Sequence, residues 1–203
     1  MLEHTTNRME QLFQTLPEFV REHSCQTALY VEQLARTVLE LSAKGLLADM
    51  LLPAMDEVGL LGRYHDLGKT KVDDTILESS RPLCDTEIGL IRSHTIAGAL
   101  IICDKLPSPE PALKLSHIIA QCCLYHHERW DGKGYPFGLS GRQIPFAARL
   151  VSIADAFDTM TANRPYHKGI ARNKARQVIW QESGKQFDPM LAQAFCDFFP
   201  QDI

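Results

Sequence analysis

Two adjacent histidines, His126 and His127, open the stretch that constrains this chain most. They end a predicted helix and lead into a loop that closes on Gly134-Tyr135-Pro136, which no regular helix continues through. Neighbouring helical residues point roughly 100° apart around the axis. Both imidazoles can therefore bind one metal cluster only if that cluster lies against the helix end. Taken alone, the pair is better explained as a solvated helix terminus, where histidines favour the helix dipole.

The other histidines change that interpretation. Five of the eight lie on or at the ends of four predicted helices with apolar core faces: His23, His65, His94, His126 and His127. Asp66 adjoins one of them, and Asp155 interrupts the apolar face of a fifth helix. Imidazole nitrogens with carboxylate oxygens suit divalent iron, manganese, nickel and zinc. Seven such ligands exceed one four-coordinate site and fit two metals that share a carboxylate.

Each of these residues also has an ordinary explanation when taken singly. A lone buried histidine is usually a hydrogen-bonded core residue, and Asp155 could simply pair with Arg149. The metal interpretation therefore depends on all seven residues lying together. Two histidines outside any motif, His4 and His117, are expected to be structural or exposed.

Apolar residues recur at helical spacing, and no segment shows the sustained alternation typical of a strand. The sequence therefore predicts an all-α, single-domain helical bundle with a Gly- and Pro-rich loop after His127. We expect residues 1–16 to be an N-terminal helical extension and residues 17–203 to be the main domain. The predicted helices cover about residues 6–16, 18–43, 53–64, 85–101 (with His94 in the middle), 112–125, 145–160, 173–183 and 189–199.

Composition limits the partners and the compartment. The chain of 203 residues is 45% hydrophobic, which suits one globular domain, and its net charge of -4 argues against a nucleic-acid polymer as partner. Its six cysteines form no C-x-x-C pair and are expected to be reduced, mostly buried thiols. We expect no signal peptide and no apolar run able to span a bilayer. These features predict a cytoplasmic protein that does not act at a membrane.

Taken in order, the motifs resemble those of the HD-GYP domain, a branch of the HD phosphohydrolase superfamily. The resemblance covers nearly all of residues 18–199. A bare His-Asp pair is a weak signal, whereas the long stretch from His126 to Pro136 with an aspartate downstream is a specific one. The matching segments are His23-Ser24, His65-Asp66-Leu67-Gly68-Lys69, His94, His126 to Pro136, Ala148 to Asp158, Arg164-Pro165-Tyr166 and Phe187-Asp188-Pro189.

The resemblance implies hydrolysis of the bacterial second messenger cyclic di-GMP to linear pGpG, in some members continuing to GMP. It also implies two divalent metals, expected to be iron, with manganese, nickel or zinc as alternatives. A hydroxide between the metals would attack the phosphorus. The implied ligands are His23, His65, Asp66 and Asp155 for one metal, and Asp66, His94, His126 and His127 for the other, with Asp66 as the bridge.

The same resemblance implies contacts to the substrate. Lys69 would stabilise negative charge on the phosphoryl group, although without the motif it would be taken for a surface lysine. Arg164, His167 and Lys168 would contact phosphates. His167 stands where the family usually has Arg or Lys, so it carries full charge only when protonated. Tyr135 would either stack on guanine or pack the loop.

One departure from the family pattern bears on the number of metals. Some members hold a third metal through a Glu one turn before the first ligand histidine, and this chain has Phe19 there, which cannot ligate. Glu18 and Glu22 are near but are expected on other helix faces. We therefore expect two metals.

Three functions stay open on the sequence. The first is a cyclic di-GMP phosphodiesterase. The second is an HD phosphohydrolase that acts on cyclic GMP-AMP or another nucleotide. The third is a non-catalytic module that binds a cyclic dinucleotide or a partner protein, which the complete ligand set argues against. Diguanylate cyclases, other signalling proteins and a second copy of the chain are the candidate partners.

Overall fold

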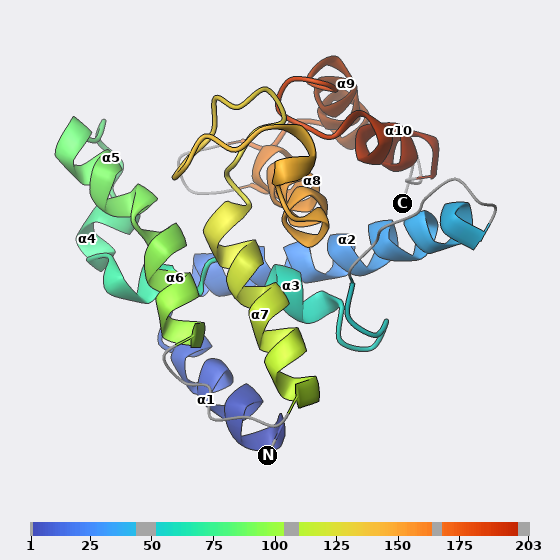
Figure 1. Cartoon of the computed structure of the whole chain (residues 1–203). Coiled ribbons are helices and arrows are strands. Elements are labelled where there is room, and N and C mark those ends of the chain that lie inside the picture. The colour runs from blue at the N-terminus through green and yellow to red at the C-terminus, as the bar shows by residue number, and fades with distance from the viewer. Residues whose placement is uncertain (1, 44–51, 104–109, 164–167, 199–203) are drawn as a thin grey trace.

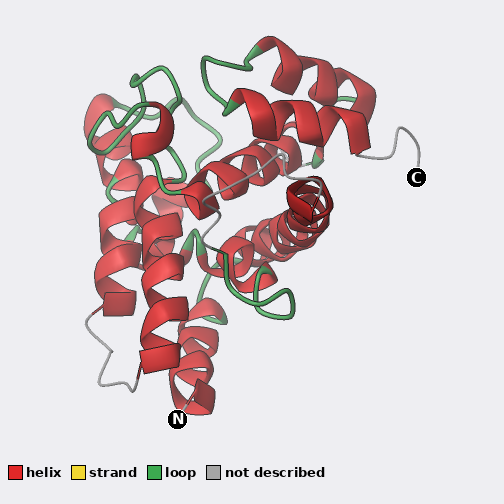
Figure 2. Ribbon diagram, turned by 45° about the vertical axis from the view of Figure 1, so that its right-hand side comes forward, coloured by secondary structure: helices red, strands yellow, loops and turns green. Residues whose placement is uncertain are grey.

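The computed structural model describes residues 2–43, 52–103, 110–163 and 168–198. These residues form helices joined by turns and loops, with no strand in the described ranges (Figures 1 and 2). The all-α fold predicted from the apolar spacing is therefore confirmed. The elements are α1 (Leu2–Phe13), α2 (Glu18–Ala43), α3 (Gly59–Tyr64), η1 (Leu67–Lys71), α4 (Asp74–Leu77), α5 (Asp85–Arg92), α6 (His94–Cys103), α7 (Glu110–Tyr125), η2 (Gly141–Gln143), α8 (Phe146–Thr161), α9 (Arg172–Gln181) and α10 (Pro189–Phe198).

The longest helix, α2, crosses the bundle and carries much of its core (Figure 1). Val31, Leu34, Ala35 and Val38 recur at helical spacing and are all buried. The helix packs on both α3 and α8. This packing brings the first turns of α2, which carry His23, to the same place as the ends of elements far away in the sequence.

The 3-10 helix η1 and helix α6 approach each other closely at Gly68. A Cβ atom on Gly68 would lie 1.9 Å from the carbonyl oxygen of His94 and 2.5 Å from the backbone nitrogen of Gly98, so a larger residue does not fit. Asp66 and Lys69 flank this glycine in the sequence. The close approach therefore sets both side chains against the first turn of α6.

Helix α1 packs against the segment that ends in His65. Phe13 and Leu16 are buried, and the ring of Phe13 meets the ring of Tyr64 edge-on, with centroids 6.0 Å apart. The Arg63 guanidinium donates two hydrogen bonds to Glu10, at 2.8 and 3.0 Å. The extension therefore shares its core with α3, and a domain boundary at residue 16 stays a prediction.

The helix predicted from Pro53 is wrong in its first half. Only Gly59–Tyr64 is helical, whereas residues 53–54 have no regular structure and residues 55–58 form a turn. The N–H of Glu57 donates to the carbonyl of Ala54 at 2.9 Å, an i to i-3 pattern tighter than an α-helix. Val58 and Leu61 are nevertheless buried, so the apolar spacing identified core residues but not the element that holds them.

The single helix predicted from residue 85 is also wrong, because it divides at Ser93 into α5 and α6. Side chains of three successive residues donate to carbonyls one turn back: Ser93 to Leu90, His94 to Ile91 and Thr95 to Arg92. Such local bonds compete with the helical ladder. His94 consequently begins α6. The apolar residues of α5 and α6 do not share one buried face, since Ile88, Ile96 and Leu100 are 36%, 44% and 62% exposed.

One stretch of the described residues, Asp85–Cys103, is long and apolar enough to cross a membrane when judged by length and composition alone. Its mean hydropathy is 1.2 and 28% of it is buried. The sequence expectation that no run reaches this threshold is therefore wrong. Core helices of soluble proteins pass the same test, so the stretch is weak evidence for a membrane span.

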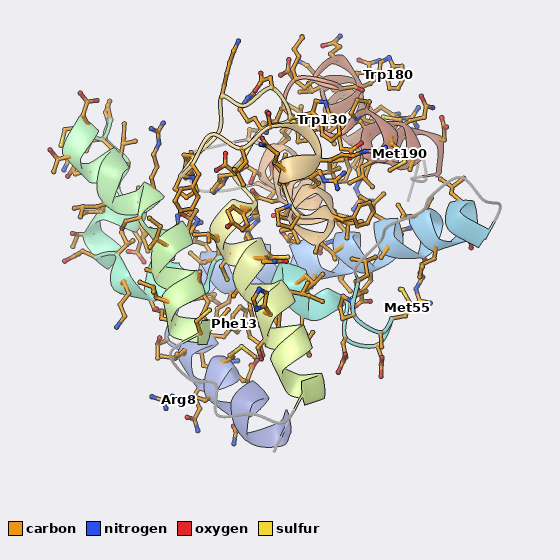
Figure 3. The ribbon with its side chains drawn as sticks, viewed as in Figure 1. Arg8, Phe13, Met55, Trp130, Trp180 and Met190 are labelled. Carbon is orange, nitrogen blue, oxygen red and sulfur yellow. The ribbon has the colours of Figure 1, made fainter. Side chains whose placement is uncertain are left out.

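The C-terminal helices are joined to α8 and to the loop after α7. Arg149 of α8 pairs with Asp188, which caps α10 by accepting from the N–H of Met190 at 2.9 Å. Arg149 therefore does not pair with Asp155, the alternative weighed for that carboxylate. The same guanidinium lies 5.7 Å from the ring centroid of Trp130, whereas Trp180 on α9 is 51% exposed (Figure 3).

Candidate metal centre

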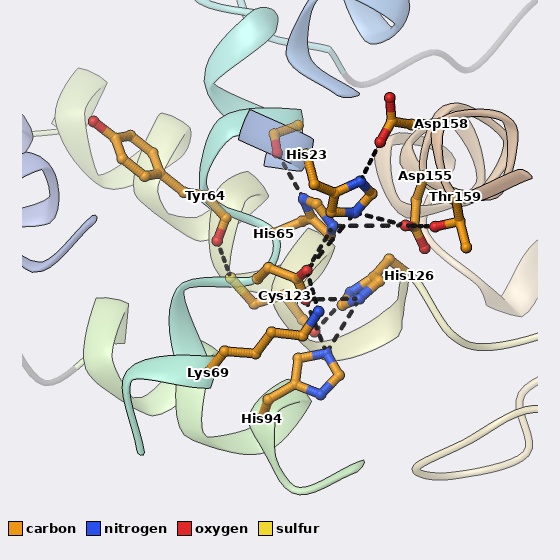
Figure 4. A network of polar contacts seen from close by, with 12 residues as sticks. His23, Tyr64, His65, Lys69, His94, Cys123, His126, Asp155, Asp158 and Thr159 are labelled. Carbon is orange, nitrogen blue, oxygen red and sulfur yellow. Dashed lines mark hydrogen bonds and ion pairs between the residues drawn. The ribbon is translucent and has the colours of Figure 1, made fainter. Parts of the chain in front are cut away.

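Seven side chains from five parts of the chain converge in the middle of the bundle. We call this group the His–Asp cluster. Figure 4 shows His23, His65, His94, His126 and Asp155 pointing toward one another. Each member lies on a core helix or directly at a helix end, where packing fixes the backbone. The members are His23 from α2, His65 and Asp66 after α3, His94 at the start of α6, His126 and His127 after α7, and Asp155 from α8. The structure thus brings together all the residues for which the sequence predicted a metal role, and the role itself stays a prediction.

Asp66 lies at the centre of the cluster. Its Oδ2 is 3.4 Å from Nε2 of His65 and 3.8 Å from Nε2 of His23. Its Oδ1 is 3.3 Å from Nε2 of His94 and 3.9 Å from Nε2 of His126. Each carboxylate oxygen therefore faces one half of the cluster, as a bridging ligand would require.

The donor atoms fall into overlapping groups, each compact enough to hold one cation. Within each group the ligand atoms lie within 4.8 Å of one another. Because His65 belongs to two groups, the cation positions would be close neighbours. The groups are His23, His65 and Asp66; His94, His126 and His127; and His65, His126 and Asp155.

Three of the histidines are oriented by backbone carbonyls. Nδ1 of His65 donates to the carbonyl of Gly62 at 2.6 Å, and Nδ1 of His94 donates to Ile91 at 2.6 Å. Nδ1 of His126 donates to Cys122 at 2.8 Å. A proton held at Nδ1 leaves Nε2 as the acceptor, so all three lone pairs point into the cluster.

His23 is oriented differently, by a carboxylate that the sequence analysis did not assign. Its Nδ1 lies 2.5 Å from Oδ2 of Asp158, while its Nε2 lies 3.0 Å from Oδ1 of Asp155. Burial alone would lower the pKa of His23, but hydrogen bonds to Asp155 and Asp158 raise it to about 9. The available signal was spacing, since Asp158 follows Asp155 by three residues and so lies on the same side of α8.

The other ionisation states suit a metal. Burial lowers the pKa of His94 and His126 to about 4, so both imidazoles are neutral near pH 7. Burial would raise the pKa of Asp66, but Lys69 and the neighbouring imidazoles hold it well below its usual range. Apart from His23, which is protonated near pH 7 until a metal displaces its proton, the cluster offers neutral imidazoles and ionised carboxylates, the forms in which these residues ligate.

Two buried atoms of the cluster have no hydrogen-bond partner among the described residues, Nε2 of His65 and Oδ1 of Asp66. A buried polar atom left without a partner costs about 1–3 kcal/mol. A divalent cation between them would supply the missing interaction. The residues present therefore fit the divalent metals that the sequence predicted.

The predicted substrate contacts are placed unevenly. Lys69 lies beside the cluster, with Nζ 2.5 Å from Oδ2 of Asp66. The ring of Tyr135 stacks on His127, with centroids 4.9 Å apart and planes inclined by 27°. Lys168 is exposed, and Arg164 and His167 lie outside the described residues.

The loop that carries Tyr135 is held by a buried glutamate. Glu128 is 2% exposed and accepts hydrogen bonds from three successive backbone N–H groups, those of Phe137, Gly138 and Leu139, at 2.7 to 3.1 Å. A Cβ atom on Gly134 would lie 2.4 Å from the nitrogen of Arg129, so the loop folds closely onto its own start. Glu128 lies within the motif from His126 to Pro136, and nothing in the sequence pointed to its role in the loop.

Two cavities flank the His–Asp cluster. The large cavity, of about 1270 Å³, reaches His23 and Asp158, and Glu18, Phe19 and Glu22 line it as well. All three of those α2 residues thus border the same cavity, and the expectation that the two glutamates lie on other helix faces stays a prediction. The small cavity, of about 250 Å³, reaches His126, His127 and Asp155 and is bordered by Arg92, Lys133 and Tyr135.

Comparison with known proteins identifies the family. A model of the HD domain matches residues 7–191, which is most of the chain. The chain belongs to the HD domain family. The resemblance drawn from the motifs is thereby confirmed at the level of the HD domain family. A solved structure with a similar fold is "Bd1817, a HDG"Y"P protein" from Bdellovibrio bacteriovorus. That match has a TM-score of 0.60 over 88% of this chain and 51% of the other, at 20% identity, and so shows the fold alone.

Curated HD-domain relatives carry names from one class of enzyme. The chain is 40% identical over 143 residues to the cyclic di-GMP phosphodiesterase PA4108 of Pseudomonas aeruginosa. The aligned region covers 70% of this chain and 33% of that protein. It is 29% identical over 181 residues to the 3'3'-cGAMP-specific phosphodiesterase 2 of Vibrio cholerae, covering 89% of this chain and 32% of that protein. The chain thus spans about a third of the length of the curated relatives it matches.

Proposed function

We propose that this HD domain hydrolyses cyclic di-GMP to linear pGpG, with further hydrolysis to GMP as an extension of the same chemistry. The observation that carries the proposal is the His–Asp cluster, in which seven donors face one another around two buried atoms without a hydrogen-bond partner. The names of the relatives supply the substrate class. In this proposal residues 17–203 form the catalytic domain, and α1 is an extension packed onto it.

The proposed centre holds two divalent cations, with iron as the expected metal and manganese, nickel or zinc as alternatives. One cation would be held by His23, His65, Asp66 and Asp155, and the other by Asp66, His94, His126 and His127. When bound, the pair would supply Lewis acidity and lower the pKa of water toward neutrality. Phe19, which cannot ligate, stands where members with a third metal have a Glu, so we propose two cations. Glu18 and Glu22 border the same cavity, and the metal count tests whether either of them ligates.

The protein's own groups would bind the substrate and compensate its charge. Lys69 lies at the mouth of the cluster and would face a phosphoryl oxygen, so it would stabilise the charge that develops there. Tyr135 stays a proposed base contact through the edge of its ring, because the ring stacks on His127 and Arg92 lies over it. Arg164, His167 and Lys168 remain proposed phosphate contacts.

A second substrate is supported by one observation. Relatives named 3'3'-cGAMP-specific phosphodiesterases cover more than four-fifths of the chain. A cyclic GMP-AMP differs from cyclic di-GMP in one base, and the metal cluster acts on a phosphodiester that both share. A non-catalytic binding module is opposed by the complete set of ligands. A cytoplasmic location, signalling partners and a homodimer stay predictions.

The test is hydrolysis by protein purified without air and reconstituted with Fe²⁺ or Mn²⁺. Cyclic di-GMP and 3',3'-cyclic GMP-AMP are incubated separately, and the products are separated by chromatography. We expect metal-dependent formation of pGpG, lost in the chelator-treated protein and in Asp66→Asn. Failure of fully metal-loaded protein to cleave either compound would refute the proposal, and cleavage of the cyclic GMP-AMP alone would move it to the second substrate.

A further inference from the structure

Arg92 occupies a position at the small cavity that no part of the proposed function uses. It is the last residue of α5, two residues before His94. Its guanidinium carbon lies 5.0 Å from the centroid of the Tyr135 ring, and that ring in turn stacks on His127. The three side chains therefore form a column that leads from the rim of the small cavity to the His–Asp cluster.

The backbone around Arg92 is fixed relative to the cluster. The carbonyl of Arg92 accepts from Thr95 at 3.1 Å, and the carbonyl of the preceding Ile91 accepts from Nδ1 of His94 at 2.6 Å. Thr95 and His94 are both buried. Arg92 is thus an exposed side chain on a rigid support, which is the arrangement expected of a residue that positions a ligand.

Arg92 also differs from the other arginine at this cavity, because its positive charge is not paired with a carboxylate of the described residues. Within the described part of the chain no carboxylate lies within ion-pair distance of it. Arg129, the other arginine at the cavity, is bound to Asp131 at 3.1 Å and to Glu182 at 3.5 Å. The contact of Arg92 with Tyr135 covers one face of the Arg92 guanidinium but leaves the N–H groups at its edge available.

The two acidic residues at the cavity are engaged by groups other than Arg92. Asp155 is engaged by Nε2 of His23 at 3.0 Å, and Glu128 accepts three backbone N–H groups of its own loop. Lys133 adds a second exposed cation at the rim. An anion that enters the small cavity therefore meets a positive rim on its way to the cluster.

Resting on the proposed function, we infer that Arg92 binds the second phosphodiester of the cyclic dinucleotide while the first is cleaved at the His–Asp cluster. A cyclic dinucleotide carries two phosphodiesters in one ring, so a substrate held at the cluster by one of them must place the other some distance away. The planar fork of arginine matches two phosphate oxygens at once. A mononucleotide has no second phosphodiester to offer, so this contact would favour cyclic dinucleotides over mononucleotides.

The experiment compares Arg92→Gln and Arg92→Lys in the metal-loaded protein, with cyclic di-GMP as substrate. We expect Arg92→Gln to raise KM by about 10- to 100-fold, the usual effect of losing charged hydrogen bonds, with a much smaller change in kcat. Arg92→Lys should recover part of the loss, because it restores charge but not the fork. Arg142→Gln, an exposed arginine of η2 that does not line the cavity, is the matched control and should keep the wild-type KM.

Metal content and thermal unfolding of each variant separate binding from structure. Normal metal content with a raised KM supports the inference. An unchanged KM in Arg92→Gln, or a fall in kcat together with loss of metal, would overturn it while leaving the proposed function intact. Absence of turnover of any cyclic dinucleotide by the wild-type holoenzyme would instead overturn the proposed function, and the role of Arg92 with it.

Discussion

Replacing Asp158 with asparagine tests whether the carboxylate behind His23 strengthens one half of the proposed metal centre. Asp158 is 3% exposed, and its Oδ2 lies 2.5 Å from Nδ1 of His23. Asparagine has nearly the same size and can still accept that hydrogen bond through its carbonyl oxygen. The substitution therefore removes the charge while largely preserving the packing.

The expected effect is a loss of about 10- to 100-fold in affinity for the cation that His23 holds, the usual result of removing an outer partner of a ligating histidine. This loss corresponds to about 1.4–2.8 kcal/mol. The half of the cluster around His94 and His126 should change little, because both are anchored by backbone carbonyls that the substitution does not touch. One cation of the two should therefore weaken.

The assay is elemental analysis of the protein after dialysis against a series of buffered free Mn²⁺ concentrations. Wild-type protein should titrate two metals, and Asp158→Asn should need about 10- to 100-fold more free Mn²⁺ for one of them. Asp131→Asn is the matched control, since it removes a carboxylate that pairs with Arg129 outside the cluster. Equal Mn²⁺ affinity in Asp158→Asn and wild type would refute the reasoning, and equal weakening of both metals would show that Asp158 acts on the fold instead.

Two further substitutions and one pH dependence are predicted from the contacts of the same residues. Asp66→Asn should abolish the rise in melting temperature that Mn²⁺ gives the wild type, because the shared ligand is lost; an unchanged rise would argue against Asp66 as the bridge. Glu128→Gln should lower the free energy of unfolding by about 1–3 kcal/mol in a denaturant titration, because the amide of glutamine would oppose one of the three backbone N–H donors that the buried carboxylate accepts from. Wild-type stability would contradict that account. The pKa of metal-free His23 is raised to about 9, so its imidazole is protonated at pH 7.5. Metal binding should therefore release this proton, and metal affinity should rise with pH through the neutral range. Calorimetry in two buffers of different ionisation enthalpy measures that release, and identical heats in both buffers would show that no proton leaves.

The sequence predicted the members of the cluster better than the elements that hold them. His23, His65, His94, His126 and His127 stand out because imidazoles are uncommon on core faces, and α2 was predicted with its observed bounds because its apolar spacing is long and regular. The helix from Pro53 and the unbroken helix from Asp85 failed for a local reason. Turn bonds at Glu57, and the side-chain bonds of Ser93 and its neighbours, displace the helical ladder without changing the apolar count.

The partners of the ligands could not be predicted from spacing alone. Asp158 appears in the sequence as one more acidic residue of α8, and its function depends on α2 packing against that helix. Arg92 becomes notable only when α5 ends beside the loop of Tyr135, a contact between segments more than forty residues apart. Leu29 shows that an apolar residue of α2 need not belong to the core, since the structure leaves it 57% exposed.

Anomalous scattering from crystals of the metal-loaded protein, collected on both sides of the iron or manganese absorption edge, tests the central proposal most directly. We expect two well-occupied metal peaks, one on each side of the Asp66 carboxylate, with His23 beside one and His94 beside the other. A single peak, a third well-occupied peak near Phe19, or no peak within the His–Asp cluster after reconstitution would contradict the two-metal centre proposed for this HD domain.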